Sequence, residues 1–134
     1  MKKFIVYTDG GSRGNPGPAG CGIYITDDTW ESVEKRFRYI WIATNNIAEY
    51  TAAELGIKRA IELWATEIEL KADSQLVIEQ LSGNYKVKNP ELKRIYHDIG
   101  NALSEWGGKI IFTHIRRELN KEADRLSNVA MDNK

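Results

Sequence analysis

The hydrophobic pattern of this chain changes at Asn46, and that change limits the folds available to it. Before Asn46, three β-rich segments at 4–8, 21–26 and 33–42 are joined by short connections, which predicts an antiparallel meander. Helical and strand patterns then alternate, at 46–64, 67–72, 74–81, 90–106, 109–115 and 120–131. Because strands that alternate with helices form parallel crossovers, we expect an α/β fold with a mixed five-stranded sheet flanked by helices.

The chain shows no internal division. No repeat or linker interrupts its 134 residues, so we expect a single domain over 1–134. Its one cysteine allows no internal disulfide, and the apolar run at 4–7 is too short for a signal peptide or a membrane span. These features predict a cytoplasmic protein with no membrane partner.

Four carboxylates occupy positions where strands end or helices begin. Asp9 ends the apolar run 4–8, Asp73 follows the run 68–72, Glu49 lies early in a helix, and Asp124 lies in the first turns of the last helix. Carboxylates that meet at strand ends repel one another by several kcal/mol unless a cation lies between them. Hard oxygen ligands favour Mg²⁺ or Mn²⁺ over zinc, so the pattern predicts two-metal phosphoryl-transfer chemistry.

The charge balance is compatible with a polyanionic partner. Lys+Arg and Asp+Glu both number 19, and setting aside the four proposed ligands leaves 19 − 15 = +4. Two divalent ions would cancel the charge of those ligands. The metal-loaded protein would therefore be modestly cationic, which suits a nucleic acid.

Three of the four carboxylates also have a structural alternative. Asn46 and Glu49 have the spacing of a capping box, although Glu49 also shares a helical face with the small residues Ala53, Gly56 and Ala60. Asp73 and Ser74 suit a helix cap, and Asp124 suits a helix N-terminus. Asn120 is expected to cap the last helix. The conjunction of all four carboxylates favours a site.

Two further segments are candidates for substrate contact. Residues 9–20 hold five of the eleven glycines, and we interpret them as a substrate-facing loop, with a tight hairpin connection as the alternative. The segment 85–89 interleaves Tyr85 with Lys86 and Lys88, a pattern that contacts a nucleic-acid backbone or forms a solvated loop.

Four ordered blocks, at 7–17, 44–50, 72–77 and 120–126, resemble type 1 ribonuclease H, in the form that lacks a basic protrusion. The resemblance covers nearly the full length and implies a ribonuclease H-like fold with two metal ions held by Asp9, Glu49, Asp73 and Asp124. It implies hydrolysis of the RNA strand of RNA/DNA hybrids, leaving 5′-phosphate and 3′-hydroxyl ends. Substrate contacts are then expected from a further set: Gly10, Gly11, Ser12, Asn15, Asn45, Ser74, Lys86 and Lys88.

Two departures from the family pattern affect these expectations. Only residues 82–89 stand where many relatives carry a basic helical protrusion, so the affinity for hybrid is expected to be lower. The segment 115–119 is short and lacks glycine, whereas some relatives carry a histidine on a flexible loop before the fourth carboxylate. The group that assists turnover is therefore either Arg117 or His114. For His114 the alternative is a satisfied histidine at a strand end, on the same face as Ile110 and Phe112.

Other functions share these motifs. A nuclease acting on double-stranded RNA would carry the same residues, and a non-catalytic hybrid-binding module would lack one or more carboxylates. All four are present, which favours an enzyme that acts on RNA/DNA hybrid. We also expect the protein to be a monomer.

Overall fold

The five strands form one mixed sheet in the order β3-β2-β1-β4-β5, as seen in a computed structural model that describes residues 2–134. Strands β1, β2 and β3 pair antiparallel, while β1–β4 and β4–β5 are parallel, which confirms the predicted sheet. In chain order the elements are β1 Lys3–Ser12, β2 Gly17–Asp27, β3 Ser32–Ala43, α1 Asn45–Glu62, β4 Glu67–Ala72, α2 Gln75–Leu81, α3 Pro90–Trp106, β5 Lys109–His114, η1 Arg117–Leu119 and α4 Lys121–Asp132.

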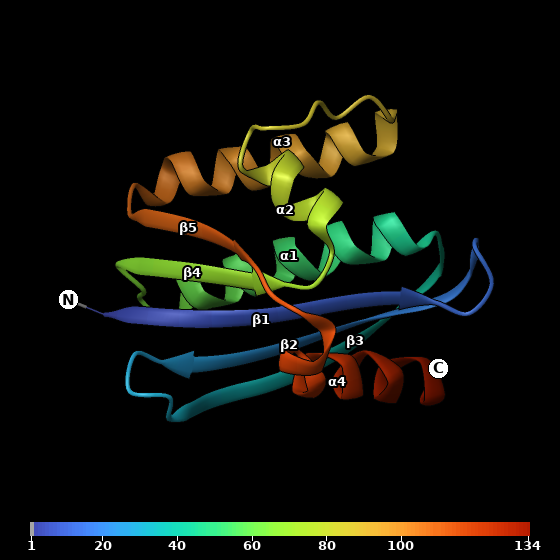
Figure 1. Ribbon diagram of the computed structural model, residues 1–134, viewed down its shortest axis with the longest axis horizontal. Helices are drawn as coiled ribbons and strands as arrows, with labels where there is room; N and C mark the ends of the chain where they lie inside the picture. Colours follow the sequence, from blue (N-terminus) through green and yellow to red (C-terminus); the bar gives the residue numbers. More distant parts are fainter. Residues whose placement is uncertain (1) are drawn as a thin grey trace.

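Glycines bring two helices unusually close to opposite faces of the sheet. Figure 1 shows α1, α2 and α3 on one side and α4 on the other. A Cβ at Gly56 of α1 would lie 2.8 Å from the side chains of Val6 and Thr8, and a Cβ at Gly22 of β2 would lie 2.1 Å from the Ala123 carbonyl oxygen of α4. The predicted stripe of small residues on α1 is therefore confirmed as a packing surface.

The glycine-rich segment is mostly strand, and its interpretation as a loop over 9–20 was wrong. Strand β1 continues through Gly10 and Gly11 to Ser12, and β2 begins at Gly17, so that only residues 13–16 connect them. The reason is packing: a Cβ at Gly10 would lie 2.2 Å from the backbone of Ala48. Gly10 is thus required for the approach of α1 to β1.

Two helix starts also differ from expectation. Thr44 caps α1, because its hydroxyl accepts a hydrogen bond from the Ile47 N–H at 3.2 Å, so the proposed box of Asn46 and Glu49 is not formed. Asn120 occupies the N-cap position of α4, but its side chain makes no capping hydrogen bond. Both side chains, Glu49 and Asn120, turn towards the ends of β1 and β4.

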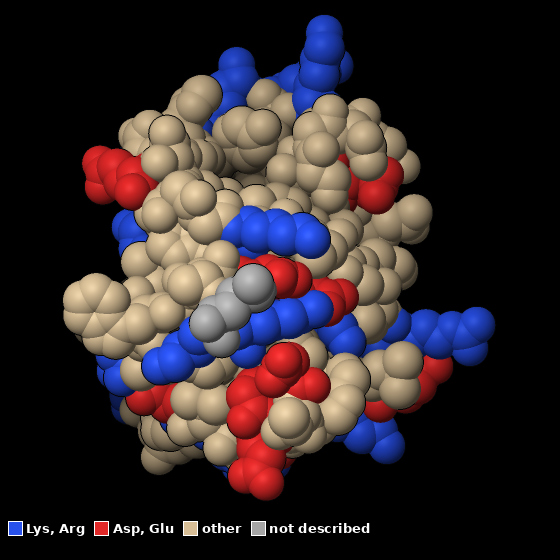
Figure 2. All heavy atoms as spheres, turned by 90° about the vertical axis from the view of Figure 1, so that its left-hand side faces the viewer, with Lys and Arg blue, Asp and Glu red and all other residues tan. Residues whose placement is uncertain are grey.

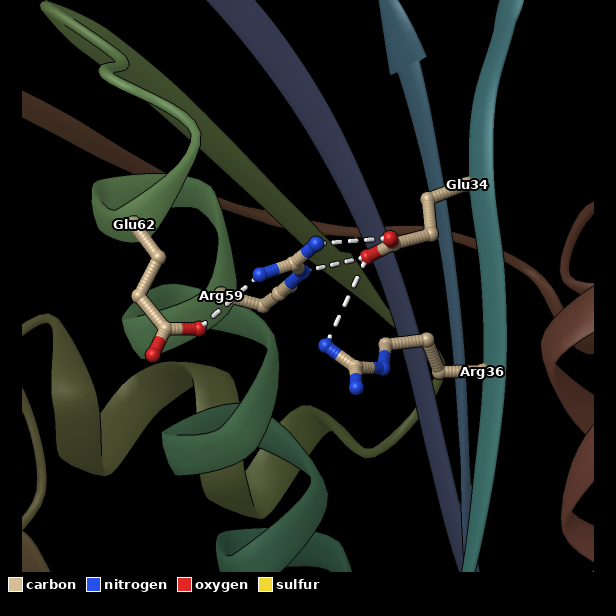
Figure 3. Close-up of polar contacts among 4 residues, drawn as sticks. All are labelled: Glu34, Arg36, Arg59 and Glu62. Atoms are coloured by element: carbon tan, nitrogen blue, oxygen red, sulfur yellow. Dashed lines mark hydrogen bonds and ion pairs between the residues drawn. The ribbon is translucent and has the colours of Figure 1, made fainter.

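An ion-pair network joins the outer strand β3 to α1 (Figure 3). Arg59 donates to both oxygens of Glu34, at 2.6 and 2.8 Å, and Glu62 and Arg36 join the network at 3.3 and 3.7 Å. The hydrogen bonds from Arg59 are the main reason that the pKa of Glu34 is lowered. This bidentate pair fixes the edge strand against the helix that carries Glu49.

The end of the molecule at which β1 begins carries charges of both signs. Figure 2 shows cationic and acidic side chains interspersed on this face. Lys3, for example, lies 3.4 Å from Glu67 and 3.9 Å from Glu69. Mixed charges of this kind favour solubility more than the binding of a polyanion.

Across residues 2–134, no helix is both long enough and apolar enough to cross a membrane.

Candidate active site

A cleft of about 480 Å³ opens where β4 ends and β1 continues, between the first turns of α1 and the body of α4. Parallel strands bring their carboxyl ends to one edge of a sheet, so Asp9 on β1 and Asp73 directly after β4 become neighbours. The full lining consists of Asp9, Gly10, Gly11, Ser12, Arg13, Asn45, Asn46, Glu49, Asp73, Ser74, Arg117, Asp124, Ser127, Asn128 and Met131.

Three of the predicted ligands meet at one point in this cleft. Asp9, Glu49 and Asp73 each offer a carboxylate oxygen, and these oxygens all lie within 4.8 Å of one another. Glu49 reaches the group from α1, where its Oε1 accepts a hydrogen bond from the Gly10 N–H at 2.6 Å. Asp124 lines the same cleft from α4 but lies outside that closest group.

Burial disfavours the ionised forms of Asp9 and Glu49, and neighbouring carboxylates add to the effect. Burial raises the pKa of Asp9 to about 6, a rise opposed by a hydrogen bond from Ser127 and increased by the charges of Asp73 and Asp124. Burial, and then the charge of Asp9, raises the pKa of Glu49 well above its ordinary value. Three carboxylate oxygens this close together are hard donors that match a site for a divalent cation, which would offset their mutual repulsion.

Two asparagines fix the backbone at the rim of the cleft. The Asn45 side chain accepts a hydrogen bond from the Ser12 N–H at 2.9 Å, and the Asn15 side chain accepts one from the Asn45 N–H, also at 2.9 Å. Asn45 and Ser12 line the cleft, whereas Asn15 is not part of its lining. Ser74 both lines the cleft and caps α2 through Val77. The roles of these residues in substrate contact remain predictions.

Of the two candidates for assisting turnover, only Arg117 lines the cleft. Arg117, at the start of η1, is exposed and lines the cleft. His114 ends β5 outside the cleft lining, with its Nε2 3.3 Å from the Asp73 backbone carbonyl. His114 is exposed, and this contact at the end of β5 agrees with the alternative of a satisfied histidine at a strand end.

Replacing Arg117 by Ala should therefore reduce kcat by at least about tenfold and by more than His114→Ala does, because the guanidinium is a permanent charge within the cleft. Single-turnover cleavage across a pH series would compare the two variants. A larger loss in His114→Ala, together with the disappearance of a limb near pH ~6.5, where free histidine titrates, would assign the role to His114.

Lys86 and Lys88 lie apart from the carboxylates. Both are exposed on the connection between α2 and α3, where they border a separate hollow of about 540 Å³ together with Tyr85, Lys93 and Tyr96. This connection occupies the place of the missing protrusion. Their role in binding the substrate backbone remains a prediction.

Replacing both Lys86 and Lys88 by Glu should raise KM and reduce the salt dependence of binding, with little change in kcat. Each lost phosphate contact lowers the slope of log affinity against log salt by roughly 0.9 on a duplex. Affinity titrations at several salt concentrations measure this slope. Lys109→Glu, at the exposed start of β5, is the control, and its charge change matches that of Lys86→Glu or Lys88→Glu made singly. An unchanged slope in the double variant would place the substrate elsewhere.

The sequence interpretation missed several residues of the cleft. Ser127, Asn128 and Met131 follow Asp124 by three, four and seven residues on α4, so a helical period counted from Asp124 would have identified them. Arg13 and Asn46 also line the cleft; they lie within the blocks 7–17 and 44–50 but were not predicted as site residues.

Known proteins share both the sequence and the fold. A reverse transcriptase-like family model matches residues 7–130. The chain is 44% identical over 131 residues to the bifunctional protein Rv2228c of Mycobacterium tuberculosis, covering 97% of this chain but only 36% of that protein. It is 32% identical to the ribonuclease H of Hydrogenovibrio crunogenus, covering 98% of this chain and 97% of that protein.

Solved structures agree with these relatives. The LC11-RNase H1 structure, in complex with RNA/DNA hybrid, superimposes with a TM-score of 0.92 at 40% identity and covers 97% of both chains. The matches run through the sheet, the helices and the strand ends that carry the carboxylates. This chain belongs to the type 1 ribonuclease H family.

Proposed function

We propose that this chain is a metal-dependent endonuclease that hydrolyses the RNA strand of RNA/DNA hybrids and leaves 5′-phosphate and 3′-hydroxyl ends. The observation that carries the proposal is the meeting of Asp9, Glu49 and Asp73 within 4.8 Å in an open cleft. The similarity to an RNase H1 solved with hybrid supports the choice of substrate. The chain spans only 36% of the length of the mycobacterial relative. The activity is therefore proposed for this chain, and it is equally a proposal for any longer protein that contains it.

The residues of the cleft suit this reaction. Two Mg²⁺ ions, or Mn²⁺ in their place, held by Asp9, Glu49, Asp73 and Asp124 would activate the attacking water and stabilise the departing 3′-oxygen. Arg117 would hold a phosphate of the bound strand by its fixed charge. Asp124 approaches from α4, opposite Glu49 on α1, so that the scissile phosphate would lie between the two helices.

Discrimination of RNA from DNA would rest on the ribose. The proposal assigns contacts with the 2′-hydroxyl to Glu49 and to the backbone at Gly10 and Gly11, which form one wall of the cleft. Little reading of bases is then required.

A panel of labelled substrates tests the proposal. Hybrid, RNA duplex, DNA duplex and single-stranded RNA of one sequence are incubated with the protein and Mg²⁺ or Mn²⁺, and the ends of the products are mapped. We expect internal cleavage of the RNA strand of the hybrid. Faster cleavage of the RNA duplex would favour the double-stranded RNA alternative, and binding without cleavage would favour the non-catalytic module. The monomeric state and the cytoplasmic location stay predictions from the sequence.

A further inference from the structure

Asn120 does not cap α4, although its position and residue type favour capping. It stands at the N-cap of α4, yet its side-chain amide donates to the Thr8 backbone carbonyl at 2.9 Å and to Asp73 Oδ2 at 3.0 Å. The side chain is 1% exposed, and its Oδ1 has no hydrogen-bond partner among the described residues. A buried acceptor without a partner costs free energy, so these contacts are maintained against a penalty.

The amide of Asn120 spans a break in the sheet. The β1–β4 ladder ends with the pair Tyr7 and Lys71, so the Thr8 carbonyl lies just beyond the last paired residue. Asn120 satisfies that carbonyl with one N–H and contacts the Asp73 carboxylate with the other. It thereby ties the end of β4 to the residue that precedes Asp9.

Ser127 makes the equivalent contact with Asp9. Its hydroxyl lies 2.9 Å from Asp9 Oδ2 and 2.8 Å from the Asp124 backbone carbonyl, and the residue is 1% exposed. A hydroxyl proton favours a charged acceptor over a neutral one, so ionised Asp9 is the better partner. Ser127 follows Asn120 by seven residues, which places both side chains on the same face of α4.

We propose that Asn120 and Ser127 are positioning residues: each engages the Oδ2 atom of one aspartate, Asp73 or Asp9, and so leaves the Oδ1 atom of that aspartate for the shared metal. The role of these contacts in holding a metal rests on the proposed function. The contacts themselves are present whether or not that function is correct. Helix α4 then contributes more than Asp124, because its two buried neutral side chains set the orientation of both strand-end ligands. Hydrogen bonds of this kind orient metal ligands before the ion arrives.

A calorimetric titration of the protein alone with Mn²⁺ or Mg²⁺ tests the proposal. Ser127→Ala removes the hydroxyl but introduces a good helix former, so the fold should be retained. We expect metal binding to weaken by about tenfold and the Mg²⁺ concentration for half-maximal cleavage to rise equally, with an unchanged KM for hybrid at saturating metal. Asn120→Ala should act in the same direction and should also lower stability in chelator, because the Thr8 carbonyl loses its partner.

The matched control is Thr113→Val on β5. It removes a comparable bond, from the Thr113 hydroxyl to Glu69 Oε2 at 2.7 Å, away from the cleft. Metal binding equal to wild type in Ser127→Ala, or an equal weakening in Thr113→Val, would overturn the proposal. Weakened binding in Ser127→Ala would uphold it even if wild-type protein left the hybrid intact, a result that would count against the proposed function alone.

Discussion

Asp9→Asn should lower kcat for hybrid cleavage by about 10²–10³-fold or more while the fold remains intact. The substitution keeps the shape of the side chain but removes the charge at the centre of the cluster formed with Glu49 and Asp73. Asp73→Asn should have a similar effect, because it removes the charge at the end of β4. Single-turnover cleavage at saturating Mg²⁺ measures the loss.

Asp9→Asn should also stabilise the metal-free protein. Burial raises the pKa of Asp9 from 3.8 to about 6. Ionising this group in the folded protein therefore costs on the order of 3 kcal/mol more than in the unfolded chain. Because the folded-state pKa is the higher one, wild-type protein binds its proton more tightly when folded and loses stability as the pH rises through that range. Asp9→Asn should therefore melt several degrees above wild type at about pH 8 in chelator, and the difference should shrink towards about pH 4.

Asp98→Asn is the matched control, since Asp98 is a carboxylate on α3 outside the cleft, 3.5 Å from Arg94. It should leave both kcat and the pH dependence of melting close to wild type. Near-normal turnover by Asp9→Asn would remove Asp9 from the reaction. A melting difference that does not vary with pH would mean that the charge of Asp9 is well tolerated in the free protein.

Removal of divalent ions should abolish cleavage completely. Excess chelator leaves the carboxylates of Asp9, Glu49 and Asp73 without the countercharge that their arrangement requires. Restoring Mg²⁺ or Mn²⁺ should recover turnover and raise the melting temperature, because a ligand that binds only the folded state adds about 1.4 kcal/mol of stability at tenfold excess over its Kd.

Thermal melts and cleavage assays across a metal titration check this expectation. The metal-induced rise in melting temperature should be largely lost in Asp9→Asn and retained in Asp98→Asn. Full cleavage of hybrid in excess chelator would refute metal-dependent catalysis. A normal rise in melting temperature in Asp9→Asn would place the ion at another site.

Sequence patterns located the elements well because local physics dominates them. Strand β4 was predicted with its observed limits, and Asn89 with Pro90 marked the start of α3, where the Asn89 side chain accepts hydrogen bonds from Glu91 and Leu92. The segment 9–20 was wrongly predicted to be a loop because glycine usually indicates a turn. Here its missing side chains serve the packing of α1 and α4 on strands, which no local pattern reports.

The sequence by itself determined the order of elements and the identity of the carboxylates, since each depends on residues close together in the chain. The alternation of strands with helices also predicted the sheet type. Tertiary structure alone decided that Asp9, Glu49 and Asp73 meet within 4.8 Å, because they are contributed by β1, α1 and the end of β4. It also decided that Asn120 and Ser127 serve those carboxylates. Capping propensity is a local preference, and for Asn120 it was outweighed by a carbonyl and a carboxylate brought close only by folding, 112 and 47 residues away.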